Sequence, residues 1–214
     1  MNKLYIVATP IGNLKDITQR ALEALQQADF VLCEDTRVTR KLLTHFNIKT
    51  PMISYHQHSK LSKIERIKEL LNNNDLALVS DAGTPGISDP GNKLIEQVRD
   101  ICEIIPIPGV SAMSTIISIS GFPTDRFLFL GFIPQKKKRK QFIEQINNFQ
   151  YPVIFYESCY RIIKTLKQLD QDLEIVVGRE LTKKFETIYR GTIDKVIDMI
   201  EKDKIKGEFT IIRR

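Results

Sequence analysis

The chain has 214 residues, of which 42% are hydrophobic and 27% charged, values typical of a globular protein with an ordinary core. No apolar run approaches the roughly 20 residues that cross a bilayer, and the first residues lack the apolar segment of a signal peptide. We therefore expect a cytoplasmic protein without a membrane partner. The formal charge of +6 indicates a nucleic-acid partner only weakly. The three cysteines form no CxxC pair, which argues against disulfides and a zinc site.

Short apolar runs alternate with helical patterns along the first half of the chain. The expected strands lie at residues 4–8, 30–33, 52–55, 76–79 and 104–107. Apolar residues recur at helical spacing at about 16–28, after residue 35, and at 61–71, 92–101 and 111–120. This alternation predicts an open, mostly parallel sheet.

Three of these strands end in loops rich in Gly and Pro. Residues 80–91 read Ser-Asp-Ala-Gly-Thr-Pro-Gly-Ile-Ser-Asp-Pro-Gly, 9–13 read Thr-Pro-Ile-Gly-Asn, and 108–112 read Pro-Gly-Val-Ser-Ala. Parallel strands place their carboxyl ends on one side of a sheet, so we expect these loops to share a ligand site. Neither G-x-G-x-x-G nor G-x-x-x-x-G-K-[ST] occurs, which excludes the simple NAD and P-loop readings.

Charged residues gather where the second predicted strand ends. Glu34, Asp35, Arg37 and Arg40 follow it, and they could line a cleft, or cap and solvate the next helix. His56 and His58 follow the third strand without an evident third partner for a metal, so we expect no metal site. A solvated loop and a substrate contact are both open for these histidines.

The pattern starts again after residues 121–125, which we expect to link a domain of residues 1–120 to one of residues 121–214. Strands are predicted at 127–131, 152–157, 174–178, 188–191 and 209–212, and helices at about 141–149, 158–169 and 193–200. Five consecutive cations, residues 136–140, follow the first of these strands. They could begin a solvated helix or contact phosphates.

Five stretches of the chain together resemble one family. They are residues 4–14, 34–43, 80–91, 122–132 (Phe-Pro-Thr-Asp-Arg-Phe-Leu-Phe-Leu-Gly-Phe) and 178–183 (Gly-Arg-Glu-Leu-Thr-Lys). In this order, and over essentially the whole chain, they are similar to the bacterial 16S rRNA ribose 2′-O-methyltransferases of the tetrapyrrole-methylase superfamily. The chain departs from the family at residues 156–161, Tyr-Glu-Ser-Cys-Tyr-Arg, where relatives usually read Tyr-Glu-Ser-Pro-His-Arg.

The resemblance implies an α/β enzyme of two domains, one with a mostly parallel open sheet and one with a mixed sheet. It implies S-adenosylmethionine in the cleft between the domains, and a homodimer. The implied substrate is the ribose 2′-hydroxyl of a cytidine in the decoding region of 16S rRNA, in free RNA or in the small-subunit particle. The alternatives are a methylase acting on a tetrapyrrole or a protein side chain, and a non-catalytic RNA-binding assembly factor.

The family's motifs and side-chain chemistry suggest site residues. By motif, the cofactor contacts would be Ile11, Ala82, Gly83, Thr84, Ile87, Ser111, Ala112, Tyr156 and Leu181. Methyl transfer from a sulfonium needs alignment and a proton acceptor, for which the candidates are Asp35 first, then Glu34 and His56. Cations can hold RNA phosphates, and the candidates are Arg37, Arg40, Lys136, Lys137, Lys138, Arg139, Lys140 and Lys183.

Overall fold

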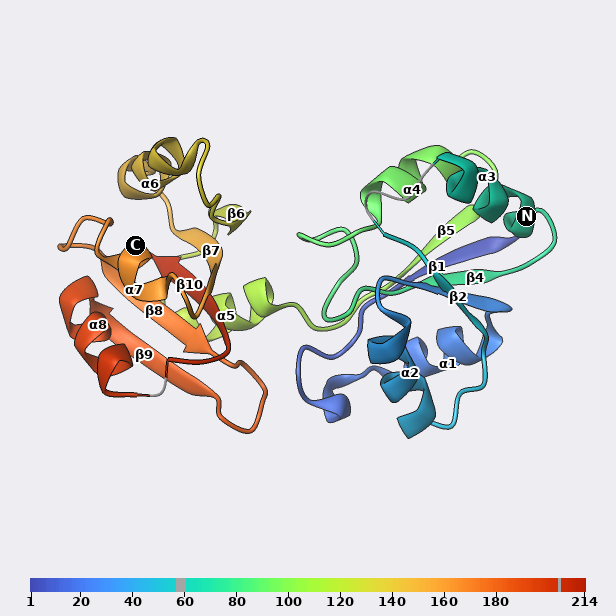
Figure 1. The fold of residues 1–214 in the computed structure, drawn as a ribbon, viewed down its shortest axis with the longest axis horizontal. Helices are drawn as coiled ribbons and strands as arrows, with labels where there is room; N and C mark the ends of the chain where they lie inside the picture. Colours follow the sequence, from blue (N-terminus) through green and yellow to red (C-terminus); the bar gives the residue numbers. More distant parts are fainter. Residues whose placement is uncertain (57–60, 204) are drawn as a thin grey trace. The chain divides into compact units, whose positions relative to one another are not determined.

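The computed structural model describes residues 1–56, 61–203 and 205–214. The chain divides into two compact units, Met1–Ser111 and Ala112–Arg214. Each unit has its own five-stranded sheet (Figure 1). The expectation of two α/β domains, one with a parallel and one with a mixed sheet, is therefore confirmed.

The first unit is a parallel sheet with the strand order β3-β2-β4-β1-β5. Every neighbouring pair of strands is parallel. The strands are β1 (Lys3–Val7), β2 (Phe30–Cys33), β3 (Met52–Ser54), β4 (Leu76–Leu78) and β5 (Glu103–Ile107). All the carboxyl ends, and the loops that follow them, therefore lie along one edge of this sheet.

Helices cover both faces of this sheet (Figure 1). Val7 and its neighbours pack against α1 (Gln19–Gln27) and α2 (Thr36–His45). Leu4 and its neighbours pack against α3 (Leu61–Leu71) and α4 (Asn92–Val98). Because both faces are buried, the strands are almost continuously apolar.

Helix α1 begins later than the apolar spacing predicts. Residues Leu14–Asp16 form a separate short 3-10 helix. The hydroxyl of Thr18 then accepts a hydrogen bond from the Ala21 N–H at 3.1 Å, which caps α1. A hydroxyl that satisfies an unpaired N–H sets the start of a helix more strongly than apolar periodicity does.

The second unit is a mixed sheet with the strand order β6-β7-β10-β8-β9. Its strands are β6 (Leu128–Phe132), β7 (Val153–Ser158), β8 (Glu174–Arg179), β9 (Thr187–Thr192) and β10 (Glu208–Arg213). β6 and β7 are parallel, and the other pairs are antiparallel. β6, β7 and β8 therefore run in one direction and end at the same edge of the sheet, and β9 and β10 run the opposite way.

The core of the second unit lies on one face of its sheet. Phe155 and Ile211 pack there with side chains of α6 (Arg139–Asn148), α7 (Ile162–Leu166) and α8 (Ile193–Lys202). Helix α5 (Ala112–Ser120) packs against β8 and β10. The division between the units thus falls before α5, whereas the sequence placed the linker after it. No helix in the described ranges combines the length and apolar character of a membrane span.

Candidate active site

The loops after β1, β4 and β5 are joined to one another at the carboxyl edge of the first sheet. Thr9 and Gly83 exchange two backbone hydrogen bonds, each 2.9 Å long. The Thr9 hydroxyl donates to the Ser80 carbonyl at 3.3 Å, and the Thr84 hydroxyl donates to the Val110 carbonyl at 3.2 Å. The three loops that the sequence singles out therefore meet.

Two glycines allow the backbones of these loops to approach closely. Gly83 has φ +80°, and a Cβ there would lie 3.4 Å from Ile11 Cγ2. A Cβ on Gly109 would lie 2.9 Å from the Cβ of Ala8, closer than real Cβ contacts. The three loops contain no Lys or Arg. Exposed backbone without cations suits a ligand that hydrogen-bonds and lacks phosphates, as S-adenosylmethionine does.

The predicted cofactor residues fall into two groups. Those on the three joined loops of the first unit are Ile11, Ala82, Gly83, Thr84, Ile87 and Ser111. The others belong to the second unit: Ala112 begins α5, Tyr156 lies in β7, and the buried Leu181 follows β8. The structure thus brings six of the predicted residues into one loop cluster, and the contact of each with the cofactor stays a prediction.

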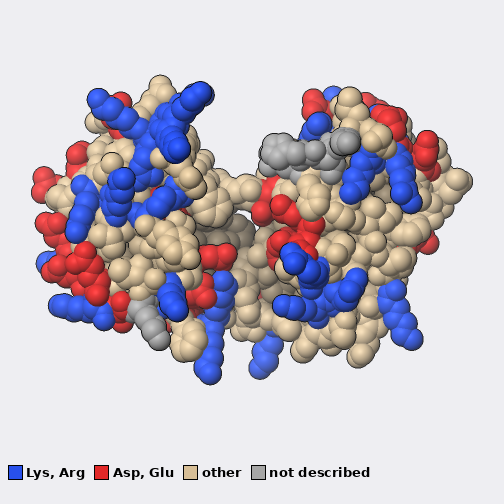
Figure 2. Space-filling view, in the orientation of Figure 1, with Lys and Arg blue, Asp and Glu red and all other residues tan. Residues whose placement is uncertain are grey.

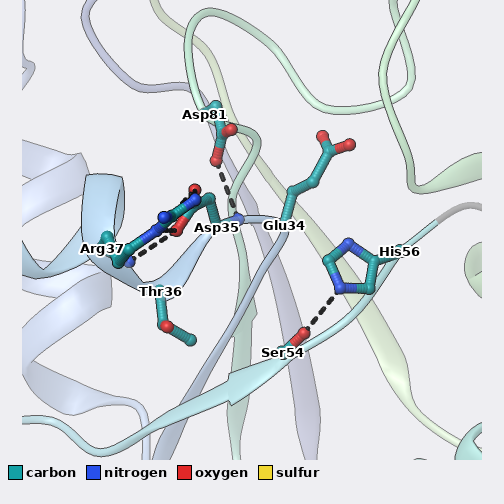
Figure 3. Close-up of a pocket in the computed structure, with 7 residues that line it drawn as sticks. All are labelled: Glu34, Asp35, Thr36, Arg37, Ser54, His56 and Asp81. Atoms are coloured by element: carbon teal, nitrogen blue, oxygen red, sulfur yellow. Dashed lines mark hydrogen bonds and ion pairs between the residues drawn. The ribbon is translucent and has the colours of Figure 1, made fainter.

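A second feature of the same edge is a pocket of about 420 Å³ at the ends of β2, β3 and β4. Figure 3 shows the residues that line it, which are Glu34, Asp35, Thr36, Arg37, Ser54, His56 and Asp81. All three predicted proton acceptors are therefore in one pocket, because β2 lies between β3 and β4 in the sheet.

Asp35 uses its carboxylate to hold the start of α2. The carboxylate accepts the Arg37 backbone N–H at 2.8 Å and pairs with the Arg37 guanidinium, with a shortest contact of 2.6 Å. Hydrogen bonds from the Arg37 side chain, followed by that from its backbone, lower the pKa of Asp35 from 3.8 to about 2. A carboxylate stabilised in this way accepts a proton poorly.

Glu34 and His56 lie on the other side of the pocket from the Asp35–Arg37 pair (Figure 3). His56 Nε2 is 2.9 Å from the Ser54 hydroxyl. The Glu34 carboxylate forms no hydrogen bond or ion pair with another described residue. Glu34 is therefore the acidic side chain of this pocket with the fewest internal constraints.

Asp81 also lines this pocket, although no pattern in the sequence singled it out. Its Oδ1 accepts the backbone N–H of Asp35 at 3.0 Å, which joins the β4 loop to the end of β2. The feature of the sequence that could have pointed to Asp81 was its position within the long Gly- and Pro-rich loop of residues 80–91. Among the described residues, no group of three His, Cys, Asp or Glu side chains could hold a metal ion.

The predicted phosphate contacts divide into exposed and internal cations. Lys and Arg side chains gather over α2 and near the start of α6 (Figure 2); the exposed residues there include Arg40 and Lys136, Lys137, Lys138 and Lys140. Arg139 points inward, with 12% of its side chain exposed and hydrogen bonds to Thr165 and Gln168.

Lys183 is also occupied by internal contacts. Its Nζ lies 2.9 Å from Glu180 Oε1 and 2.8 Å from Glu208 Oε2. Burial opposes the charged form of Lys183, but hydrogen bonds to Glu208 and Glu180 outweigh it and raise its pKa. The structure therefore favours an internal clamp between the β8 loop and β10 for this residue.

Comparison with known proteins agrees with this architecture. Residues 3–197 match the model of the family Tetrapyrrole (Corrin/Porphyrin) Methylases. The chain is 48% identical over 99% of its length to ribosomal RNA small subunit methyltransferase I of Mycoplasmopsis pulmonis, covering 97% of that protein. It is 45% identical over 98% of its length to the protein of that name from Halalkalibacterium halodurans, covering 74% of that relative.

Solved structures of low sequence identity share the fold. A cobalt precorrin-4 methyltransferase matches with a TM-score of 0.70 and 19% identity, covering 99% of this chain and 94% of that one. A diphthine synthase matches with a TM-score of 0.76 and 15% identity, covering 99% of this chain and 89% of that one. The family match over residues 3–197 and the near-complete alignments above, rather than these likenesses in fold, show that the chain belongs to the tetrapyrrole methylase family, in the group of ribosomal RNA small subunit methyltransferase I proteins.

Proposed function

We propose that this methyltransferase modifies the ribose 2′-hydroxyl of a cytidine in the decoding region of 16S rRNA. The observation that carries the proposal is 40–48% identity over nearly the whole chain to proteins named ribosomal RNA small subunit methyltransferase I. The likenesses to the precorrin methyltransferase and the diphthine synthase, at 19% and 15% identity, concern the fold alone. RNA is therefore the favoured substrate over a tetrapyrrole or a protein side chain.

The joined loops of the first unit are the proposed cofactor cradle. When bound, S-adenosylmethionine supplies a methyl group on a positively charged sulfur, which is already an activated donor. The chain's part is to hold donor and acceptor in line and to take up the hydroxyl proton. The backbone around Gly83 and Gly109 can approach a ligand closely because neither residue has a side chain.

Glu34 and His56 are the proposed proton acceptors. They line the pocket next to the cradle, and neither is held in a bidentate pair as Asp35 is. We assign Asp35 a positioning role: its carboxylate caps α2 and holds the Arg37 guanidinium at the pocket. Removal of a general base lowers turnover by typically 10²–10⁴-fold, whereas loss of a cap charge perturbs only the local structure.

Phosphate contacts are the proposed role of the exposed cations. Arg40 on α2 and Lys136, Lys137, Lys138 and Lys140 before and in α6 are exposed, so attraction and counterion release can both contribute to RNA binding. Such contacts read the shape of the RNA more than its sequence. From the family resemblance we propose a homodimer acting in the cytoplasm, on the RNA or the small-subunit particle.

Methyl transfer from labelled S-adenosylmethionine to immature small subunits tests the proposal. We expect label in 16S rRNA, at a cytidine ribose by nuclease mapping. Glu34→Gln should lower turnover about 100-fold, and Asp35→Asn by no more than a few-fold. Label in a protein or in a tetrapyrrole offered as competitor would replace the RNA proposal. RNA binding without transfer would support a non-catalytic assembly factor.

A further inference from the structure

A bulge in β6 determines where Phe132 points. Phe129 pairs with Ile154, but Phe132 pairs with Tyr156, so three steps along β6 match two along β7. Gly131 supplies the left-handed residue, with φ +62°. Residues three apart in a regular strand face opposite sides, and the extra residue of a bulge returns Phe132 to the face of Phe129.

Tyr156 supports the Phe132 ring from one side. The ring centroids of Phe129 and Phe132 each lie 5.2 Å from that of Tyr156, in edge-to-face arrangements. Nevertheless 57% of Phe132 is exposed. An aromatic ring that is fixed by a neighbour and open to solvent is suited to stack on a flat partner.

A basic loop begins immediately after Phe132. Lys136, Lys137 and Lys138 are exposed, and their ammonium groups form no ion pair with a described residue. Lys138 has the left-handed φ of +66° and ends the loop at the start of α6. Three adjacent cations thus follow the exposed Phe132 ring in the loop between β6 and α6.

Two arginines fix the start of this loop to a buried carboxylate. Arg161 Nη1 donates to the Ile133 carbonyl at 3.1 Å, and Arg139 Nη1 donates to the Pro134 carbonyl at 3.3 Å. Both guanidinium groups contact Glu157, at 2.6 Å from Arg161 and 3.7 Å from Arg139. Glu157 is only 1% exposed. The loop is therefore preorganised, which lowers the entropic cost of binding.

We propose that Phe132 and Lys136–Lys138 form a binding site for single-stranded RNA. A base stacks on the exposed face of the Phe132 ring, and the lysines hold the neighbouring phosphates. Stacking on an aromatic ring beside cations is the general mode of single-strand binding. This inference rests on the proposed RNA substrate and names the side chains that bind a segment of it.

Charge argues for RNA over the two other occupants of such a surface. The adenine of S-adenosylmethionine could stack on Phe132, but that molecule has no phosphate for three lysines. A second copy of the chain, related by two-fold symmetry, would place the same lysines near each other, and like charges oppose such a contact. An RNA strand offers both a base and phosphates.

Binding to a short fluorescein-labelled, cytidine-rich single-stranded RNA, followed by fluorescence anisotropy, tests the site. Phe132→Ala should weaken binding about 10-fold, and Phe132→Tyr should keep most of the affinity. Phe185→Ala is the matched control, because Phe185 is 66% exposed on another loop of the same unit; it should change affinity less than ~2-fold. Replacing all three lysines with Gln should reduce the salt slope of log K by about 2.

Two further measurements, of S-adenosylhomocysteine affinity and of the monomer–dimer equilibrium, decide between the occupants. Affinity for S-adenosylhomocysteine, by calorimetry, should be equal in wild type and Phe132→Ala. Unchanged RNA affinity in Phe132→Ala would overturn the site, and lost cofactor affinity would assign the ring to adenine instead. A monomer–dimer shift in Phe132→Ala without loss of RNA binding would assign it to a second copy. If small subunits receive no methyl group but the RNA measurements behave as expected, only the proposed reaction fails.

Discussion

The first unit and the second unit hold the loops at the carboxyl ends of their strands with different kinds of bond. In the first unit, Thr9 and Gly83 join two loops through their backbones, and glycines leave room for the contact. In the second unit, Arg139 and Arg161 hold the loop after β6 through side chains that meet on Glu157. The carboxyl edge of the sheet in the first unit, here the first edge, has the proposed cofactor loops. The edge of the second sheet where β6 ends, here the second edge, has the proposed single-strand site.

The difference shows which residue types each region depends on. Backbone hydrogen bonds do not depend on side-chain identity, so the first edge depends on small residues that allow close approach. The second edge depends on compensated buried charge, which is costly once one partner is missing. Because the arginines hold the loop after β6 from the inside, its Lys136–Lys138 side chains stay exposed and can contact a polyanion.

Removal of Glu157 should have the largest effect on stability. Glu157→Ala leaves two guanidinium groups without their carboxylate, and we expect a loss of about 3 kcal/mol in the free energy of unfolding. Urea denaturation measures it. Glu144→Ala is the control, since Glu144 is 3.8 Å from the exposed Lys140 and should cost less than ~0.5 kcal/mol. Equal losses in both variants would show that the second edge does not depend on buried charge.

An added methyl group should break the first edge. Gly109→Ala places a Cβ 2.9 Å from that of Ala8, and relief of such a clash moves the backbone at a cost of about 1–3 kcal/mol. We expect S-adenosylhomocysteine to bind about 10-fold more weakly by calorimetry. The double variant Ala8→Gly with Gly109→Ala restores the space and should recover part of the affinity. A single variant with wild-type affinity would contradict the cradle.

Alanine variants of Lys183 and Lys137 should distinguish a cation that stabilises the fold from one that binds RNA. Lys183→Ala removes two ion pairs to Glu180 and Glu208, and we expect about 1 kcal/mol less stability with unchanged RNA affinity. Lys137→Ala should leave stability unchanged and weaken RNA binding in a salt-dependent way. Urea denaturation and anisotropy on both proteins give the comparison. Weaker RNA binding by a folded Lys183→Ala variant would show that Lys183 contacts RNA after all.

Asp35→Asn should have the smallest effect on stability at neutral pH, and its difference from the wild type should become visible in acid. Its pKa is about 2 in the folded protein against an ordinary 3.8, so the folded state binds its proton less readily than the unfolded state. Its contribution to stability is therefore present above about pH 4 and is lost as the pH falls towards 2. Asp35→Asn, which cannot ionise, should lose less stability over this acid range in urea titrations. Parallel curves for the two proteins would show that Asp35 does not have this role.

The strands, the order of the loops and the family could be predicted from the sequence. Apolar runs such as Leu76–Leu78 are local signals, and so are Gly- and Pro-rich loops at strand ends. Parallel strands share one carboxyl edge, and this is why the expected meeting of three loops is found in the structure. The placement of Glu34, Asp35 and His56 in one pocket follows from the same rule.

Individual side-chain roles depended on partners that are distant in the sequence. Asp81 joins Asp35 across 46 residues, and Arg139 turns inward because Glu157 is buried beside it. The lysine run by itself did not distinguish Arg139 from its exposed neighbours, since the five cations have similar local surroundings. The direction of Phe132 depended on a register shift between two strands. Neighbouring residues determine strands, helices and loops, whereas only the packed chain decides which charges are compensated and which rings stay exposed.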